Sequence, residues 1–323
     1  MKRRSLTLSA AALALVPLLG HAQPQAFPEK PITFVVPFAA GTATDQIARA
    51  LGNSITAETK QPVVIDNKAG ASGFIASQQV AKAAADGYTV LITTNTTHAA
   101  NEHLFKKLPY DPVKDYVPIT ALGKGGQIMV VNPSFPAKSV AEFVALAKKE
   151  PGKYSFGSGS SSSRMAGELL QQMADIKLLH VPYKSNTLAV TDLLGGQIHM
   201  MITDAATGLP QLKGGKLRAL GVSSAARSPL APDVPTISEA GVKGYEMGYW
   251  FAAYAPAKTP QAVVKRLNEL LVKAAKSESA KTAFYEPTGT EVFTTSPEEL
   301  ARFQTAESQK WGRIVKAAGI EAE

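Results

Sequence analysis

Two loops of this chain combine residue types that suit the binding of a small anion. The first, residues 37–45, reads PFAAGTATD and follows a run of β-branched and aromatic residues typical of a buried strand. Ala40 and Gly41 carry little or no side chain, so backbone amides there can approach a ligand closely. Thr42 or Thr44 can cap the helix that follows, and the positive end of that helix attracts anions. An ordinary strand-to-helix turn is the alternative.

The second loop, residues 157–163, reads GSGSSSS and offers five hydroxyl groups before another helical pattern. Arg164 falls in the first turn of that helix, where a cation opposes the helix dipole. We therefore expect its side chain to reach a ligand carboxylate or, alternatively, to point into solvent. A third polar stretch, TTNTTH, ends at His98 and offers several hydrogen-bond donors and an imidazole, or forms an ordinary polar loop.

The usual signatures of enzymes and cofactor sites are absent from the sequence. It contains no HExxH, GxxxxGK[ST] or GxGxxG motif, and no GxSxG motif surrounds Ser158–Ser163. His98 and His103 are five residues apart, so they do not share a helical face. The absence of cysteine excludes disulfides, thiolate metal sites and a cysteine nucleophile. We therefore expect no enzyme, cofactor or metal site, with a secreted hydrolase as the less favoured alternative.

The first residues have the pattern of a secretory signal peptide. A basic segment, Lys2–Arg4, precedes the apolar run Leu6–Leu19 and a small-x-small cleavage site, Gly20–Ala22. The apolar run is too short to span a bilayer comfortably, so an uncleaved anchor is the less favoured alternative. We expect cleavage near Ala22, so that residues 1–22 are removed and the mature protein lies in the periplasm.

Charge and composition limit the partners. The formal net charge is +8, with 34 basic and 26 acidic side chains. Because no run of five Lys or Arg residues occurs, we do not expect binding to nucleic acid. A mild positive excess fits an anionic small ligand and is also common on protein surfaces.

Strand and helix patterns alternate along the rest of the chain, which predicts an α/β fold with mainly parallel sheets. Expected strands are Ile32–Val36, Val63–Ile65, Tyr88–Thr93, Ile128–Val131, Tyr154–Phe156, Lys177–Pro182, Ile198–Ile202 and Leu217–Val222. Expected helices are Ala43–Thr59, Phe74–Ala84, Val140–Lys149, Thr187–Leu194, Pro260–Lys276 and Pro297–Ala317. Such sheets bind ligands at the carboxyl ends of their strands, which would place Phe38–Thr44 and Thr94–His98 at one edge.

Two segments are expected to connect two lobes. The glycine-rich segment Gly123–Gly126 is expected to be flexible and to cross between the lobes, and the aromatic segment Gly244–Tyr254 to cross back. The first lobe would comprise residues 27–124 and 246–323, and the second lobe residues 125–245. Glycines at these crossings would act as hinges. This organisation is that of a two-lobe periplasmic binding protein with two interdomain crossings (type II).

A series of short motifs runs in order along nearly the whole mature chain. They are the opening stretch Phe27–Gly41 with Thr44, Asp45, Ala48 and Arg49, then Asp66–Gly73, Leu108–Asp115, His180–Tyr183, Asp192–Gln197, Lys216–Leu220, Val234–Thr236 and Ala255–Ala257. Together these motifs resemble the Bug family, the TctC-like substrate-binding proteins of tripartite tricarboxylate transporters.

The resemblance implies two lobes that close like a flytrap over an organic acid, no cofactor, a monomer, and delivery of the ligand to membrane transporter subunits. Residues implied to bind the ligand are Ala40, Gly41, Thr42 and Asp45 in the first lobe, Ser158, Gly159, Ser160, Ser161, Ser162 and Asp204 in the second lobe, and Thr97 and His98 along the first-lobe wall. Presentation of the ligand to a membrane histidine kinase is the alternative role, because no motif identifies the docking partner.

Two departures from the family pattern bear on the ligand. Thr42 stands where the family usually has a second glycine, and Arg164 stands where it often has a histidine. The added hydroxyl and guanidinium groups suggest a far wall that attracts anions. We therefore hypothesise a dicarboxylate with one carboxylate held at each lobe. Phe38 and Trp250 would pack an aliphatic or aromatic spacer between them.

Overall fold

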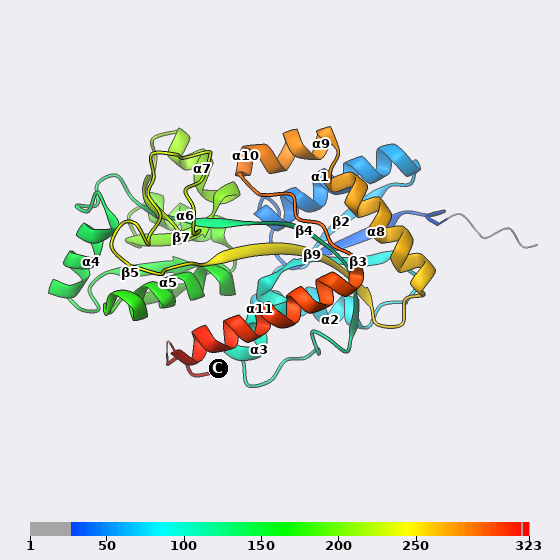
Figure 1. The fold of residues 1–323 in the computed structure, drawn as a ribbon, viewed down its shortest axis with the longest axis horizontal. Helices are drawn as coiled ribbons and strands as arrows, with labels where there is room; N and C mark the ends of the chain where they lie inside the picture. The colour runs from blue at the N-terminus through cyan, green and yellow to red at the C-terminus, as the bar shows by residue number, and fades with distance from the viewer. Residues whose placement is uncertain (1–26, 318, 323) are drawn as a thin grey trace, which may run out of the picture.

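A computed structural model describes residues 27–317 and 319–322 (Figure 1). The expected signal peptide, residues 1–22, lies outside the described residues. None of the described helices is long and apolar enough to cross a membrane.

Strands and helices alternate along the described chain, as their sequence patterns predict. The strands are β1 (Ile32–Val36), β2 (Val63–Asn67), β3 (Thr89–Thr94), β4 (Tyr116–Val131), β5 (Ser155–Ser158), β6 (Leu179–Pro182), β7 (Met200–Asp204), β8 (Arg218–Val222) and β9 (Gly248–Pro256). The longer helices are α1 (Ala43–Thr59), α2 (Phe74–Ala81), α4 (Val140–Lys149), α5 (Ser161–Ala174), α6 (Asn186–Leu194), α7 (Ala205–Lys213), α8 (Gln261–Ala275) and α11 (Pro297–Ala317). Short helical turns are η1 (Ala71–Gly73), η2 (Thr96–Ala100), α3 (Asn101–Leu104), α9 (Glu278–Ala280), η3 (Lys281–Tyr285) and α10 (Glu286–Thr288).

The strands lie in the order β2-β1-β3-β9-β4-β7-β5-β6, with β8 paired to β4. β1 pairs in parallel with β2 and β3, and β5 pairs in parallel with β6 and β7. We call the group around β1 the first lobe and the group around β5 the second lobe. β4 and β9 pair antiparallel and run between the lobes (Figure 1). The predicted α/β fold with two lobes and two crossings is confirmed.

The first crossing is a continuous strand rather than a flexible segment. Gly123, Gly125 and Gly126 lie inside the sixteen-residue strand β4 and pair with β9. A Cβ at Gly125 would lie 2.5 Å from the Tyr249 hydroxyl, and a Cβ at Gly126 would lie 2.7 Å from Ser224 Oγ. Neighbouring side chains therefore approach the backbone closely here, which explains the glycines. The expectation of a flexible Gly123–Gly126 segment was wrong.

Several helical segments, η2 and α3 among them, are not predicted by the sequence patterns. α7 follows β7 directly and contains Gly208 and Pro210, which are poor helix formers and hide the helical pattern. The short turns between Glu278 and Thr288 are likewise too brief to show a periodicity. In contrast, α11 has the predicted bounds Pro297–Ala317.

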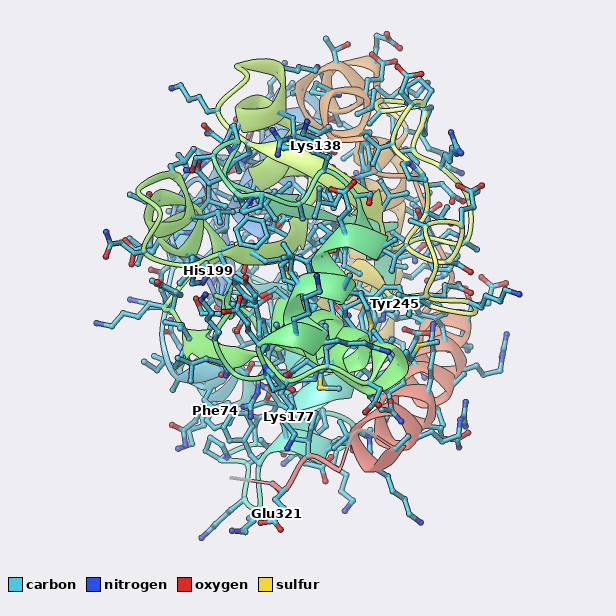
Figure 2. All side chains as sticks on the ribbon, turned by 90° about the vertical axis from the view of Figure 1, so that its left-hand side faces the viewer. Phe74, Lys138, Lys177, His199, Tyr245 and Glu321 are labelled. Atoms are coloured by element: carbon cyan, nitrogen blue, oxygen red, sulfur yellow. The ribbon has the colours of Figure 1, made fainter. Side chains whose placement is uncertain are left out.

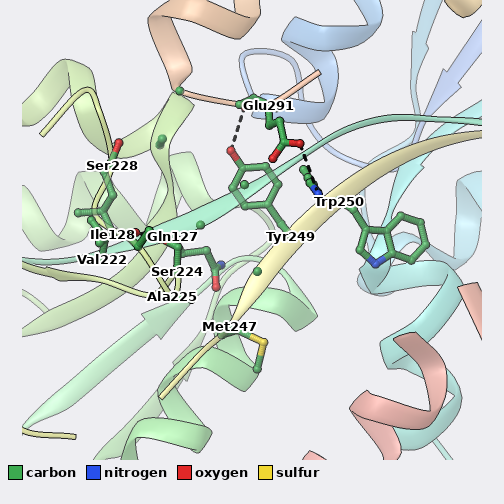
Figure 3. A pocket seen from close by; sticks show the side chains of 18 of the residues that line it. Gln127, Ile128, Val222, Ser224, Ala225, Ser228, Met247, Tyr249, Trp250 and Glu291 are labelled. Atoms are coloured by element: carbon green, nitrogen blue, oxygen red, sulfur yellow. Dashed lines mark hydrogen bonds and ion pairs between the residues drawn. The ribbon is translucent and has the colours of Figure 1, made fainter. Parts of the chain in front are cut away.

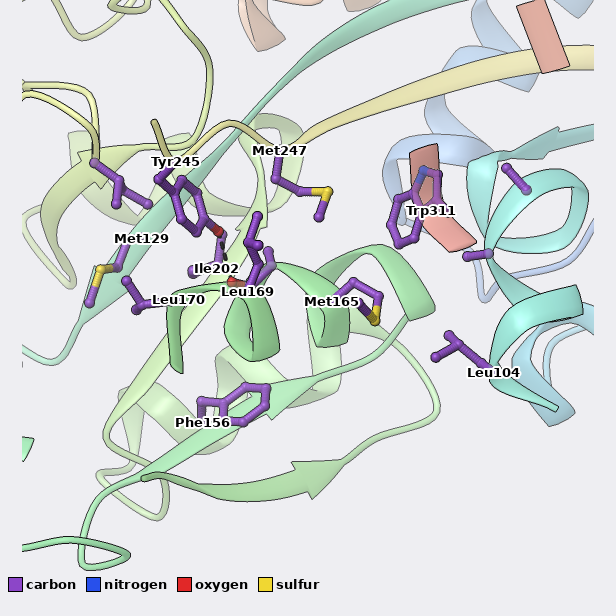
Figure 4. Packing of buried hydrophobic residues seen from close by; sticks show 14 of the residues in the cluster. Leu104, Met129, Phe156, Met165, Leu169, Leu170, Ile202, Tyr245, Met247 and Trp311 are labelled. Atoms are coloured by element: carbon purple, nitrogen blue, oxygen red, sulfur yellow. Dashed lines mark hydrogen bonds between the residues drawn. The ribbon is translucent and has the colours of Figure 1, made fainter. Parts of the chain in front are cut away.

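A hydrophobic core extends beneath both crossings (Figure 4). It joins Met129 of β4, Met165 of α5, Trp311 of α11 and Leu104 of α3. Tyr245 reinforces this contact, because its hydroxyl donates to the backbone carbonyl of Ala166 in α5 at 2.7 Å. The core therefore fixes α5, whose N-terminus faces the first lobe, against elements of both lobes.

Two lysines of the second lobe lie on its outer surface. Figure 2 views this end of the molecule and labels Lys138 and Lys177, which are both exposed and belong to separate segments before α4 and β6. Lys138 and Lys177 therefore lie apart in space as well as in sequence.

Candidate ligand-binding site

A small cavity of about 40 Å³ lies where the two lobes meet, and we call it the central chamber. The start of α1 and the end of β3 form its first-lobe wall, and the starts of α5 and α6 with the end of β7 form its second-lobe wall. Its lining residues are Phe38, Thr42, Ala43, Thr44, Thr94, Gln127, Gly159, Ser160, Ser162, Asn186, Asp204, Tyr249 and Phe251. The chamber thus brings together six of the predicted site residues: Phe38, Thr42, Gly159, Ser160, Ser162 and Asp204.

Helices α1, α5, α6 and α7 begin at the central chamber. Thr42 caps α1, and its hydroxyl accepts a hydrogen bond from the Asp45 amide at 3.5 Å. Ser160 caps α5 and accepts from the amide of Ser163 at 3.3 Å. Asp204 caps α7. The predicted helix N-termini after the two loops therefore converge from opposite lobes, and each carries a partial positive charge that suits a carboxylate.

Asp45 holds the first loop in shape and does not line the chamber. Its carboxylate accepts hydrogen bonds from the Gly41 amide at 2.8 Å, Arg49 Nε at 3.0 Å and Asn67 Nδ2 at 3.1 Å. Burial on its own would raise the pKa of this carboxyl, but the hydrogen bonds from Arg49, Gly41 and Asn67 outweigh it and lower the pKa. Asp45 was expected to bind the ligand, but its contacts here stabilise the conformation of the first loop.

Replacing Asp45 by asparagine should reduce the free energy of unfolding by about 2 kcal/mol near neutral pH, because a buried charge-assisted set of hydrogen bonds is weakened. The contribution of Arg49 is discounted, since half of its side chain is exposed. The pKa of Asp45 is lowered on folding, so its stabilisation is present above about pH 3.9 and is lost as the pH falls through the lower folded-state pKa. Urea unfolding at neutral and acid pH should show the difference from wild type shrinking in acid. A difference that is the same at every pH would contradict this account.

Two other residues of the first loop are exposed. Ala40 and Gly41 line neither the central chamber nor the second cavity described below. Gly41 has a φ of 82°, a left-handed conformation that favours glycine, and its amide is directed to Asp45. Their predicted contacts with a ligand therefore do not follow from this conformation.

His98 and Thr97 lie in the core instead of along the cleft wall. β3 continues directly into the helical turn η2, which turns the His98 ring inward, where it stacks on Tyr254 at 3.9 Å between ring centroids. The His98 side chain is completely buried, and burial lowers its pKa to about 3. Thr97 is also buried and shares hydrogen bonds with Thr93 and His98. The prediction that both line the first-lobe wall was wrong.

Trp250 faces away from the chamber. Side chains alternate along β9, and its neighbours Tyr249 and Phe251 line the chamber. The Trp250 indole donates to Glu307 of α11 at 3.2 Å and packs edge-on against Phe303. Phe38 therefore has Tyr249 and Phe251 as aromatic companions, and the suggested pairing with Trp250 was wrong.

Seven chamber residues are not among the predicted site residues. They are Ala43, Thr44, Thr94, Gln127, Asn186, Tyr249 and Phe251. Alternation along β9 could have separated Tyr249 and Phe251 from Trp250, and Thr94 ends a predicted strand at the binding edge. Gln127 and Asn186 are placed by long-range strand and helix contacts, which no local pattern reveals.

A larger cavity of about 450 Å³ adjoins the chamber, and we call it the vestibule. Phe38, Gly159 and Ser160 line both cavities. The predicted residues Ser158, Ser161 and Arg164 line the vestibule, together with His180 and Lys184. The vestibule also reaches η1 and Phe74 of the first lobe. Basic side chains therefore line the outer cavity, whereas none of those in residues 27–317 and 319–322 lines the chamber.

Arg164 lies beside an acidic residue one helical turn away. Its Nε is 3.8 Å from Oε1 of Glu168, and about a fifth of each side chain is exposed. Burial raises the pKa of Glu168, while the charge of Arg164 acts in the opposite direction. The ion pair partly offsets the unfavourable position of a cation at a helix N-terminus.

Direct hydrogen bonds join the lobes beside the chamber. Ser161 Oγ donates to Asn101 Oδ1 at 2.8 Å, and Ser162 Oγ donates to Asn95 Oδ1 at 3.3 Å. Thr96 Oγ1 and Ser162 Oγ lie 3.3 Å apart. The serines of the second loop therefore contact the first lobe in this conformation.

A third cavity of about 800 Å³ lies on the hinge side of the crossings (Figure 3). Residues 224–230 of the second lobe and 286–291 of the first lobe form its walls, and β4 and β9 form its floor. Although it is the largest of the three, it meets neither the α1 nor the α5 N-terminus. Gln127 and Tyr249 line both this cavity and the central chamber, so they form the partition between them. Among the described residues, no cluster of acidic and histidine side chains suits a metal ion.

The geometry agrees with the proteins to which this chain is similar. The structure of Rpa4515 from R. palustris with adipate is 34% identical, with a TM-score of 0.89, and the match covers 92% of this chain and 100% of that chain. The periplasmic binding protein BugD is 32% identical, with a TM-score of 0.87 and the same coverage. MatC from Rhodopseudomonas palustris with bound malate is 31% identical, with a TM-score of 0.84, over 90% of this chain and 100% of that chain.

A family model gives the same result over most of the sequence. The model of the tripartite tricarboxylate transporter family receptor matches residues 47–320. The resemblance seen in the sequence motifs is thereby confirmed. The chain belongs to the TctC family of tripartite tricarboxylate transporter receptors, which includes the Bug proteins.

Proposed function

We propose that this protein is a periplasmic receptor that captures an organic dicarboxylate by closure of its two lobes and delivers it to a tripartite tricarboxylate-type membrane transporter. The observation that carries the proposal is the convergence of the α1 and α5 N-termini, from opposite lobes, on one chamber that continues into a basic vestibule. Family membership supports the receptor role, and the adipate and malate of two neighbours support a carboxylate ligand. The signal-peptide pattern supports the periplasmic location.

In this proposal each cavity binds one carboxylate of the ligand. No Lys or Arg of the part of the chain that the structure describes lines the central chamber. An inner carboxylate there is therefore held by helix N-termini and by hydroxyls such as those of Thr42 and Ser160. An outer carboxylate is held in the vestibule by Arg164 and Lys184. Phe38 lines both cavities, so the spacer between the carboxylates passes its ring.

The small size of the chamber supports a mechanism in which the lobes open and close. About 40 Å³ is far less than the roughly 300–1,000 Å³ of typical ligand pockets. Ligand entry therefore requires the lobes to separate at the contacts of Ser161 with Asn101 and of Ser162 with Asn95. The strands β4 and β9 remain as connections, and we place the lobe boundaries near residues 124 and 246. A ligand that binds the closed form more tightly shifts the equilibrium towards it.

A thermal-shift series on ligand-free protein tests capture. Adipate, succinate and citrate are the probes, and hexanoate is the matched control that lacks the second carboxylate of adipate. At least one di- or tricarboxylate should raise Tm, since a ligand at 100 times its Kd stabilises the native state by about 2.7 kcal/mol. X-ray scattering should show a smaller radius of gyration with the same acid. No response to any acid, or a response to hexanoate as large as the largest response to a di- or tricarboxylate, would count against the dicarboxylate site.

Delivery is tested separately in cells. Deleting the receptor should abolish uptake of the acid that the purified receptor binds. Unchanged uptake would contradict the transport role without affecting the binding result.

A further inference from the structure

The side chain of Gln127, which lines the central chamber, has an amide oxygen without a hydrogen-bond partner among the described residues. Gln127 is 1% exposed. Its backbone is fully paired, because the Gln127 amide donates to Ser223 Oγ at 2.7 Å and its carbonyl accepts from the Ser223 amide at 2.8 Å. A buried amide oxygen without a partner destabilises the protein, so its presence calls for a reason.

The strand register places this amide beside Asp204. Gln127 of β4 is paired directly with Asp204 of β7, so the two side chains lie on the same face of the sheet. Both line the central chamber, and Figure 3 shows the Gln127 side chain near Tyr249 at the partition with the hinge-side cavity. An acceptor of Gln127 and an acidic group therefore adjoin the same small space.

Asp204 retains one place for a donor. A carboxylate has about four lone-pair positions. Its Oδ1 accepts from the amide and the hydroxyl of Thr207, at 2.9 and 2.8 Å, and its Oδ2 accepts from Asn186 Nδ2 at 3.0 Å. One position on Oδ2 thus remains for a donor that the described residues do not supply.

We propose that Gln127 and Asp204 determine specificity for an acid that also carries a hydroxyl or ammonium group, and this inference rests on the proposed function. A ligand carboxylate is repelled by Asp204 and goes to the N-termini of α1 and α5. The donor group of the same ligand goes to the opposite side of the chamber. There an ammonium group donates to both Oε1 of Gln127 and Oδ2 of Asp204, whereas a hydroxyl group donates its single proton to one of them. The chamber therefore separates an anion-binding side from a donor-binding side.

Calorimetry with two matched series of acids tests this assignment. The four-carbon series is succinate, malate and aspartate, and the six-carbon series is adipate, 2-hydroxyadipate and 2-aminoadipate. In at least one series the hydroxy or amino member should bind about 3- to 10-fold more tightly than the plain acid, the range expected for one hydrogen bond. The comparison of hydroxy with amino members decides between the two donors.

Gln127→Met keeps the length of the side chain and removes the amide. It should abolish the preference for the hydroxy or amino member over the plain acid of the same series. It should also raise the Tm of the ligand-free protein by about 2 °C, because the unpaired buried amide is removed. Gln197→Met is the matched control. Gln197 is exposed and precedes the first residue of β7, at the opposite end of that strand from the chamber. This control should change none of these quantities.

The outcomes separate the inference from the proposed function. Equal affinities within both series, or a preference that survives in Gln127→Met, would overturn the role of Gln127 while the carboxylate site stands. No binding of any of the six acids would overturn both.

Discussion

Replacing Gly159 by alanine should lower the free energy of unfolding by about 3 kcal/mol, at the upper end of the usual cost of overpacking. A Cβ at this position would overlap backbone atoms of Ser185 and Asn186, deep inside van der Waals contact. Backbone atoms cannot move aside as a flexible side chain can. The amide of Gly159 also donates to Asn186 Oδ1 at 2.9 Å, so the start of α5 is fastened to the start of α6 at the central chamber. Urea unfolding measures the loss.

Gly195→Ala is the control for Gly159→Ala. Gly195 lies at the end of α6 with a φ of −79°, and the nearest atom to a Cβ there is 3.6 Å away. Its replacement should change the stability by less than about 0.5 kcal/mol. If Gly159→Ala is as stable as this control, the backbone of residues 185–186 moves aside at little cost in free energy. The second-lobe wall would then not be held in the position that the binding proposal requires.

The strand and helix patterns predicted most of the fold because they depend on residues that are neighbours in sequence. β1 has the predicted bounds, and α1 and α11 do as well. The glycines of β4 show where such reasoning fails. The sequence alone cannot distinguish a glycine needed for flexibility from one needed because another group approaches the backbone closely. Gly125 is of the second kind, because the Tyr249 side chain leaves no room for a Cβ there.

The site residues in the loops before α1 and α5 could be predicted from the sequence, whereas Gln127 on strand β4 could not. The loops before α1 and α5 have small and hydroxyl residues next to helix starts, which is a local pattern. Gln127 reaches the chamber only through its pairing with Asp204, about eighty residues later in the chain. His98 has a residue type typical of a site, but the turn after β3 directs its ring into the core.

Replacing Arg164 by methionine should weaken the binding of a dicarboxylate such as adipate by about 10- to 100-fold, the worth of a charge-assisted hydrogen bond. The affinity for the monocarboxylate hexanoate should hardly change, because its single carboxylate goes to the helix N-termini of the chamber. Calorimetry on the two acids gives the ratio directly. Arg313→Met on the exposed surface of α11 is the matched control, with the same loss of charge away from the vestibule.

Glu168 complicates the interpretation of Arg164→Met and also provides its sharpest test. Removing Arg164 leaves the partly buried Glu168 without this cation, so repulsion by Glu168 would add to the loss of dicarboxylate binding. The double variant Arg164→Met, Glu168→Gln removes that repulsion. If the vestibule binds the outer carboxylate through Arg164, most of the loss should remain in the double variant, and Glu168→Gln alone should bind at least as tightly as wild type. Full recovery in the double variant would show that the loss came from the exposed charge of Glu168. The second carboxylate would then have to be held elsewhere, with Lys184 and His180 as the remaining basic groups of the vestibule.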